Sequence, residues 1–244
     1  MKIGVLIPTT SNKRDWSNIY ESYLYNITLK SFLTTYNKEH NYIFYIGIDR
    51  NDPIFDNNEE QRKILHFITV MKNVDLEFIY MDDIAKGHLT IMWNKLFEKA
   101  YNDNCEYFFQ CGDDIEFKTK NWVNDCILTL KNNNDIGLTG PINNNPYILT
   151  QSFVSRTHMK LFNYYFPPEI INWFCDDWIN EIYKKIYAFF PLKNHLCINI
   201  GGQPRYDINN DNSFRNNFNN KMVETKQFCM NIVMRDFNKI KKLI

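Results

Sequence analysis

The sequence has no excess of either charge and no long apolar run. Its 244 residues include 28 Lys and Arg against 28 Asp and Glu, so the formal net charge is zero at pH 7. Without a basic surface there is no electrostatic reason to expect a nucleic-acid partner. No stretch of about 18 apolar residues occurs, and no basic and apolar leader precedes the first strand-like run, so we expect neither a membrane span nor a signal peptide.

The six cysteines lack the close spacing of metal and redox motifs. No C-x-x-C pair is present and most of the cysteines lie inside apolar runs, so we expect reduced, buried thiols in a cytoplasmic protein and no zinc site. Asn, Lys, Ile, Tyr and Phe are used heavily, and AT-rich codons specify all five. This usage predicts an AT-rich genome, such as that of a parasite, a social amoeba or a large DNA virus. A viral protein would act in the host cytoplasm.

Short apolar runs alternate with amphipathic segments through the first half of the chain. The predicted strands cover 3–7, 42–48, 76–81 and 107–110, and the predicted helices cover 16–36, 58–71 and 88–102. This order is typical of an α/β fold, in which a Rossmann-like, mostly parallel sheet carries helices on both faces. In such sheets ligands bind beyond the carboxyl ends of the strands.

The second half of the chain predicts a smaller, mixed lobe. Helices are expected over 121–130 and 171–185, strands over 136–139 and 148–154, and a strand-like segment over 188–200 with a turn at 191–194. The Asn-rich segment 209–220 is predicted to be a mobile loop, and 221–244 a helical tail. With no internal repeat and no clear linker, we expect one domain with two lobes.

Polar residues follow each of the four predicted strands in the first half. They are Thr9 to Asn12, Asp49 to Asp52, Asp82 to Lys86, and Gly112 to Asp114. The last group follows a buried aromatic strand, and two adjacent carboxylates there are costly unless a positive charge compensates them. A divalent metal that holds a diphosphate is one answer, and a solvated turn is the alternative.

A second acidic pair, Asp176-Asp177, lies inside an aromatic run. Desolvation by Trp173 and Trp178 would raise a carboxyl pKa toward that of a useful general base. The alternative is a helix N-terminus, where the dipole favours acids. Adjacent helical residues point about 100° apart, so only one of the two should be the base, and we favour Asp177.

Three further side chains are candidates for charge contacts. Lys86, before Gly87, is a candidate phosphate contact, His195 a candidate metal ligand, and Arg205 a candidate contact to a diphosphate. The alternative for each is an ordinary solvated or structural side chain.

Taken in order, the motifs resemble those of GT-A glycosyltransferases. The resemblance is carried by Ile3 to Thr10, Ile48-Asp49, Gly112-Asp113-Asp114 and Asp176-Asp177, and it covers most of positions 1–206. It implies that Pro8, Thr9 and Thr10 line a base pocket and that Asp49 binds the base or ribose. It also implies an acidic metal motif at Asp113 and Asp114 that binds Mn²⁺ or Mg²⁺, with Asp176 or Asp177 as the base. Gly112 departs from the common Asp-any-Asp spelling, so Asp114-Ile115-Glu116 is an alternative metal motif.

The resemblance implies a metal-dependent transferase of the hexosyl or N-acetylhexosaminyl class. A sugar would pass from a nucleotide-diphosphate donor, first of all a UDP-sugar, to a hydroxyl of a glycan or protein acceptor with inversion. Residues 1–206 would form one catalytic domain, with a nucleotide-sugar-binding lobe over 1–117 and an acceptor-side lobe over 118–206, and 207–244 would form the loop and tail.

Two other functions compete with this interpretation. A sugar-phosphate nucleotidyltransferase would need a Gly-rich, basic loop after the first strand, and the segment from Thr9 to Arg14 contains no glycine. A non-catalytic module that binds a nucleotide or glycan is the other alternative.

Overall fold

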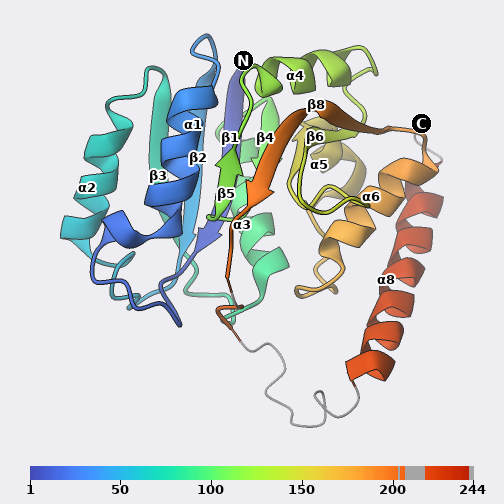
Figure 1. Cartoon of the computed structure of the whole chain (residues 1–244). Helices are drawn as coiled ribbons and strands as arrows, with labels where there is room; N and C mark the ends of the chain where they lie inside the picture. Colours follow the sequence, from blue (N-terminus) through green and yellow to red (C-terminus); the bar gives the residue numbers. More distant parts are fainter. Residues whose placement is uncertain (203, 207–217, 242–244) are drawn as a thin grey trace.

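A computed structural model describes residues 1–202, 204–206 and 218–241, and only the backbone of 218–224 (Figure 1). Residues 209–217 of the segment predicted to be a mobile loop lie outside the described residues. The described strands form one curled sheet in the order β3-β2-β1-β4-β7-β6-β8-β5. Their bounds are β1 (Lys2–Thr9), β2 (Asn41–Ile48), β3 (Val74–Tyr80), β4 (Tyr107–Gln110), β5 (Ile115–Phe117), β6 (Leu138–Ile142), β7 (Ser152–Ser155) and β8 (Phe189–Asn199).

The first four strands form the parallel half of the sheet. β1 pairs in parallel with β2 and β4, and β2 pairs in parallel with β3. The second half is mixed, because β7 runs antiparallel to β4 and β6, β8 runs parallel to β6, and β5 runs antiparallel to β8. The predicted mostly parallel α/β sheet with a smaller mixed lobe is therefore confirmed.

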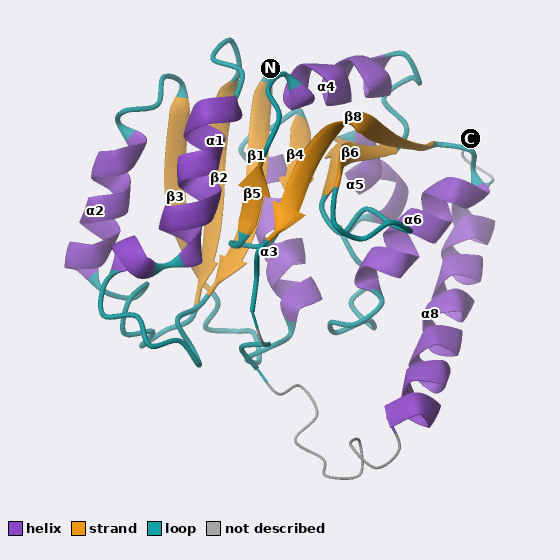
Figure 2. Cartoon of the chain, viewed as in Figure 1, coloured by secondary structure: helices purple, strands orange, loops and turns teal. Residues whose placement is uncertain are grey.

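Helices cover both faces of the sheet (Figure 2). One apolar core joins the sheet to η1 (Ile19–Glu21), η2 (Leu24–Leu29), α1 (Lys30–Thr35), α2 (Asn58–Ile68) and α4 (Trp122–Lys131). The other joins it to α3 (Leu89–Asn102), α5 (Thr157–Phe162), α6 (Cys175–Lys185) and α8 (Phe218–Ile240). α8 packs along α6 at the outer end of the molecule (Figure 1). Among the described residues, no helix combines the length and the apolar character needed to cross a membrane.

The alternation of side chains along β1 explains how one strand serves two cores. Ile3, Val5 and Ile7 enter the first core, and Leu6 enters the second, because successive side chains point to opposite faces. Gly4 also faces α3, where an added Cβ would lie 2.9 Å from Ala100 Cβ. The missing side chain thus lets α3 approach the central strand closely.

The structure differs from the predicted elements in several places, and β7 and α6 each begin four residues later than the predicted strand 148–154 and helix 171–185. Residues 16–36 form a broken helix, with a 3₁₀ turn at η1 and a π-helical turn at η2 before α1. The expected turn at 191–194 is wrong, because β8 is continuous there. Only its pairing with β6 shifts: Pro141 pairs with Leu192, and the next residue, Ile142, pairs with Leu196. β5 and α5 were not predicted, and each is too short to show a clear hydrophobic period.

Candidate active site

The polar strand ends meet at one edge of the sheet, as the sequence predicted (Figure 2). Thr9, at the end of β1, pairs with Ile48 of β2, and Leu6 pairs with Gln110 of β4. Pro8 lies inside β1, opposite Gly47. The segments that leave β1, β2 and β4 therefore begin side by side, which brings residues far apart in the sequence into one site.

Three side-chain hydrogen bonds hold the carboxylate of Asp113. It is buried, and its Oδ2 accepts hydrogen bonds from Thr9 Oγ1 at 2.5 Å and from Arg205 Nη1 at 2.6 Å. Its Oδ1 accepts from Arg205 Nη2 at 2.5 Å. The Asp113 carbonyl accepts from Thr28 Oγ1 at 2.7 Å, and Thr28 lies in the π-helical turn η2. The irregular helix thus holds the acidic loop in place, and the sequence contains no signal that would have identified Thr28.

Asp114 has a different environment from its neighbour. Burial, followed by the negative charge of Asp113, raises the pKa of Asp114 to about 6, against the opposing charges of Arg205 and Arg14. Two glycines leave room for its carboxylate. An added Cβ at Gly112 would lie 2.6 Å from Asp114 Oδ1, and one at Gly201 would lie 1.8 Å from Asp114 Oδ2 and 2.8 Å from Asn199 Oδ1. Side chains at positions 112 and 201 would thus require the Asp114 carboxylate to move.

Asp49 and Asp52 close the β2 side of the edge. The hydroxyl of Tyr206 donates to Asp49 Oδ2 and lies 3.1 Å from Thr10 Oγ1. Asp52 accepts from Thr10 Oγ1 at 2.9 Å, and its pKa is lowered because hydrogen bonds from the backbone and from Ser11 and Thr10 outweigh the effect of burial. Asp52 thus fixes the loop after β1. Our sequence analysis did not single out Tyr206, although it follows Arg205.

The second acidic pair begins α6, and its two carboxylates face different neighbours. Burial, followed by the charge of Asp177, raises the pKa of Asp176 to about 7. The charge of Asp176 also contributes to the raised pKa of Tyr165, whose hydroxyl donates to the carbonyl of Ser152 at 2.9 Å. Because Ser152 pairs with Gln110 at the end of β4, Asp176 lies toward the strand ends.

Asp177 lies on the side of α8. Its charge interacts with Lys226 and Lys184 and raises the pKa of Cys229, and Lys226 and Cys229 both belong to α8. Asp176 therefore lies on the side of α6 toward the end of β4, and Asp177 lies on the side toward α8.

The remaining candidates do not gather at the acidic pair. His195 lies at the other end of the β5–β8 ladder, where Nε2 is 2.6 Å from Asp125 Oδ2 and Nδ1 is 3.2 Å from Thr119 Oγ1. Five residues of extended chain separate Thr119 from Asp114, roughly 16 Å. Lys86 is exposed in the loop between β3 and α3, and Glu116 forms an ion pair with Lys118 at 2.6 Å.

The residues present do not by themselves form a metal cage. Within the described part of the chain, no group of three or more His, Cys, Asp and Glu side chains could hold a metal ion. Both oxygens of Asp113 already accept from Arg205, and His195 is distant. Asp114, with Asn199 beside it, is the carboxylate that stays available to a cation. Metal dependence therefore stays a prediction from the resemblance.

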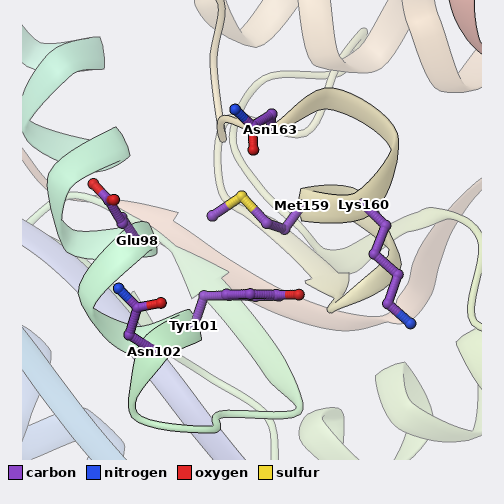
Figure 3. Close-up of a pocket in the computed structure, with 6 residues that line it drawn as sticks. All are labelled: Glu98, Tyr101, Asn102, Met159, Lys160 and Asn163. Carbon is purple, nitrogen blue, oxygen red and sulfur yellow. The ribbon is translucent and has the colours of Figure 1, made fainter.

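A cavity whose lining residues are shown in Figure 3 lies away from this edge. Its volume is about 310 Å³, and it lies between the end of α3 and α5, near the amino end of β4. Its lining residues are Glu98, Tyr101, Asn102, Met159, Lys160 and Asn163. They lie at the edge of the sheet opposite to the acidic pair, so the cavity is separate from the candidate site.

No protein-family model and no curated protein matches the sequence. Among solved structures, S. aureus TarS, a GT-A-type glycosyltransferase, is similar at 13% identity and a TM-score of 0.50, over 81% of this chain and 35% of that one. A complex of TarS 1-349 with UDP-GlcNAc is similar at 12% identity and a TM-score of 0.50, over 84% of this chain and 60% of that one. This chain thus spans between one third and three fifths of those structures. The likeness shows that the chain has a GT-A-like fold.

Proposed function

We propose that this protein is a glycosyltransferase that uses a nucleotide-sugar donor, with a UDP-sugar as the first donor to test. The observation that carries the proposal is a GT-A-like sheet whose carboxyl edge carries the acidic pair Asp113-Asp114, with a second carboxyl group of raised pKa, Asp176, toward the end of β4. The UDP-GlcNAc complex of TarS, a protein of similar fold, supports the choice of nucleotide.

In the proposed reaction, Asp176 is the general base. Its carboxylate accepts the proton of the acceptor hydroxyl, and that oxygen attacks the anomeric carbon of the donor sugar. The bond from the anomeric carbon to the diphosphate oxygen breaks, and the nucleoside diphosphate leaves with the electron pair. A single displacement of this kind inverts the anomeric configuration. Asp49 and Thr10 would bind the nucleoside.

Three features of the proposal go beyond the fold. They are the way in which the charge of the diphosphate is compensated, for which the resemblance implies Mn²⁺ or Mg²⁺, the inversion, and the choice between hexosyl and N-acetylhexosaminyl transfer to a glycan or protein acceptor. When bound, a divalent metal would act as a Lewis acid toward the diphosphate.

Thermal stability measured against UDP, GDP, CDP, CMP and ADP, each with Mn²⁺ and with EDTA, tests the proposal. A nucleotide at a hundred times its dissociation constant should stabilise the folded protein by about 2.7 kcal/mol. A shift with one diphosphate supports the donor site and identifies the base. If none of them shifts the transition of the folded protein, the proposed function is wrong.

A further inference from the structure

A short segment crosses the edge of the sheet where the donor is proposed to bind. We call residues 204–206 the strap. The hydroxyl of Tyr206 donates to Asp49, and Asn12 Nδ2 donates to the carbonyl of Arg205 at 2.5 Å. The strap is therefore anchored to the β2 side through Tyr206 and to the loop after β1 through the carbonyl of Arg205 itself.

The Arg205 side chain is built into the site and is not a passing surface contact. Its guanidinium contacts both oxygens of Asp113, at 2.6 and 2.5 Å, and the side chains of Arg205 and Asp113 are only 15% and 3% exposed. The same guanidinium lies 5.9 Å from the ring of Trp16 and 5.7 Å from that of Tyr23, within range of cation–π attraction. A carboxylate, two rings and the anchored backbone thus fix its position.

The position of this guanidinium matters because the resemblance implies a divalent cation beside the same acidic pair. To bind Asp113, a metal would have to break two charge-assisted contacts in a buried setting, which is costly. An arginine has five N–H donors, and the two contacts to Asp113 leave three of them. The planar fork of a guanidinium also matches the geometry of phosphate oxygens.

We propose that Arg205 takes the place of the divalent cation at the acidic pair and binds the donor diphosphate directly, so that donor binding does not require a metal. The inference rests on the proposed function. In the transfer step, the N–H groups of Arg205 stabilise the charge that develops on the diphosphate oxygen as its bond to the anomeric carbon breaks. Arg14, whose charge also reaches Asp114, adds positive charge on the same side.

Calorimetric titration of the full chain with UDP, once in EDTA and once in Mn²⁺, tests this inference. For the unmodified protein we expect dissociation constants that differ by less than about threefold between the two conditions. Arg205→Gln should weaken binding in EDTA by at least tenfold, because charge-assisted hydrogen bonds to the diphosphate are lost. The same variant frees Asp113, so Mn²⁺ should restore binding to it. Arg205→Lys, which keeps the charge without the fork, should fall between the two.

Arg62→Gln is the matched control, because Arg62 is an exposed arginine on α2. It should bind UDP as the unmodified protein does. The inference is overturned if the unmodified protein binds UDP only with Mn²⁺, or if Arg205→Gln binds as tightly as Arg62→Gln in EDTA. These results would leave the proposed function standing. Absence of binding to UDP and to every other nucleotide under both conditions would instead refute the proposed function and the inference with it.

Discussion

Replacing Asp176 with Asn should raise stability and abolish transfer. Burial, with the nearby charge of Asp177, raises the pKa of Asp176 from 3.8 to about 7. A folded-state pKa above the unfolded value means that ionisation destabilises the folded protein, fully above pH 7 and progressively less as the pH falls toward 3.8. The cost of the charge at pH 8 is at most about 4 kcal/mol, and at pH 5 it is under about 2 kcal/mol.

Asp176→Asn removes that charge while keeping the shape of the side chain. Urea denaturation should therefore show a variant that is more stable at pH 8, with an advantage that shrinks by more than half at pH 5. Transfer should fall by roughly 10²- to 10⁴-fold, the usual contribution of a general base. The affinity for the donor nucleotide should stay within about twofold, because the side chain acts on the acceptor. In the unmodified protein, the transfer rate should fall tenfold for each pH unit below about 7.

Asp177→Asn is the matched control, since it changes the neighbouring carboxylate by the same substitution. It should keep transfer, and it should shift the midpoint of the pH–rate profile downward because the charge of Asp177 raises the pKa of Asp176. The reasoning is refuted if Asp176→Asn retains full transfer while Asp177→Asn loses it. It is equally refuted if Asp176→Asn is no more stable than the unmodified protein at pH 8.

Two further variants test the other parts of the structure. Asp114→Asn should abolish nucleotide-sugar turnover, and intact turnover would remove Asp114 from the site. The buried carboxylate of Asp236 joins α8 to α6, because it accepts hydrogen bonds from Tyr164 Oη at 2.8 Å, Trp178 Nε1 at 3.2 Å and Arg235 Nε at 2.9 Å. Asp236→Ala removes these contacts and should destabilise the protein by about 3 kcal/mol in urea denaturation. An unchanged unfolding midpoint would show that α8 does not depend on this contact.

The parallel half of the fold is readable from the sequence because its signals are local. β2 and β4 are continuous apolar runs, and α2 and α3 begin and end within three residues of the predicted bounds. The shared edge follows from topology, since parallel strands must end on the same side. The mixed half is harder to predict from the sequence. β5, for example, has only three residues, and its position is set by its pairing with the distant strand β8.

The site residues from the second half could not be placed from local pattern. Arg205 reaches Asp113 across 92 positions, and Tyr206 reaches Asp49 across 157. Contacts between residues so far apart in the sequence do not affect the local hydrophobic periodicity. The sequence therefore marks Arg205 as a candidate but does not identify its partner. The different surroundings of Asp176 and Asp177 have a similar cause. The direction of each carboxylate depends on where α6 lies between the sheet and α8, which the sequence of α6 alone does not contain.

The spelling of the acidic motif is a consequence of the packing around Asp114. A side chain at position 112 would place its Cβ 2.6 Å from Asp114 Oδ1, so the Asp114 carboxylate would have to shift. An aspartate in the first acidic place would also add a third negative charge to a pair that already needs Arg205 for compensation. Gly112 avoids both costs, and Gly201 leaves the same kind of room from the β8 side. The motif still has two carboxylates, as an Asp-any-Asp motif has, and the guanidinium of Arg205 compensates the one at Asp113 directly, while the charges of Arg205 and Arg14 also act on Asp114.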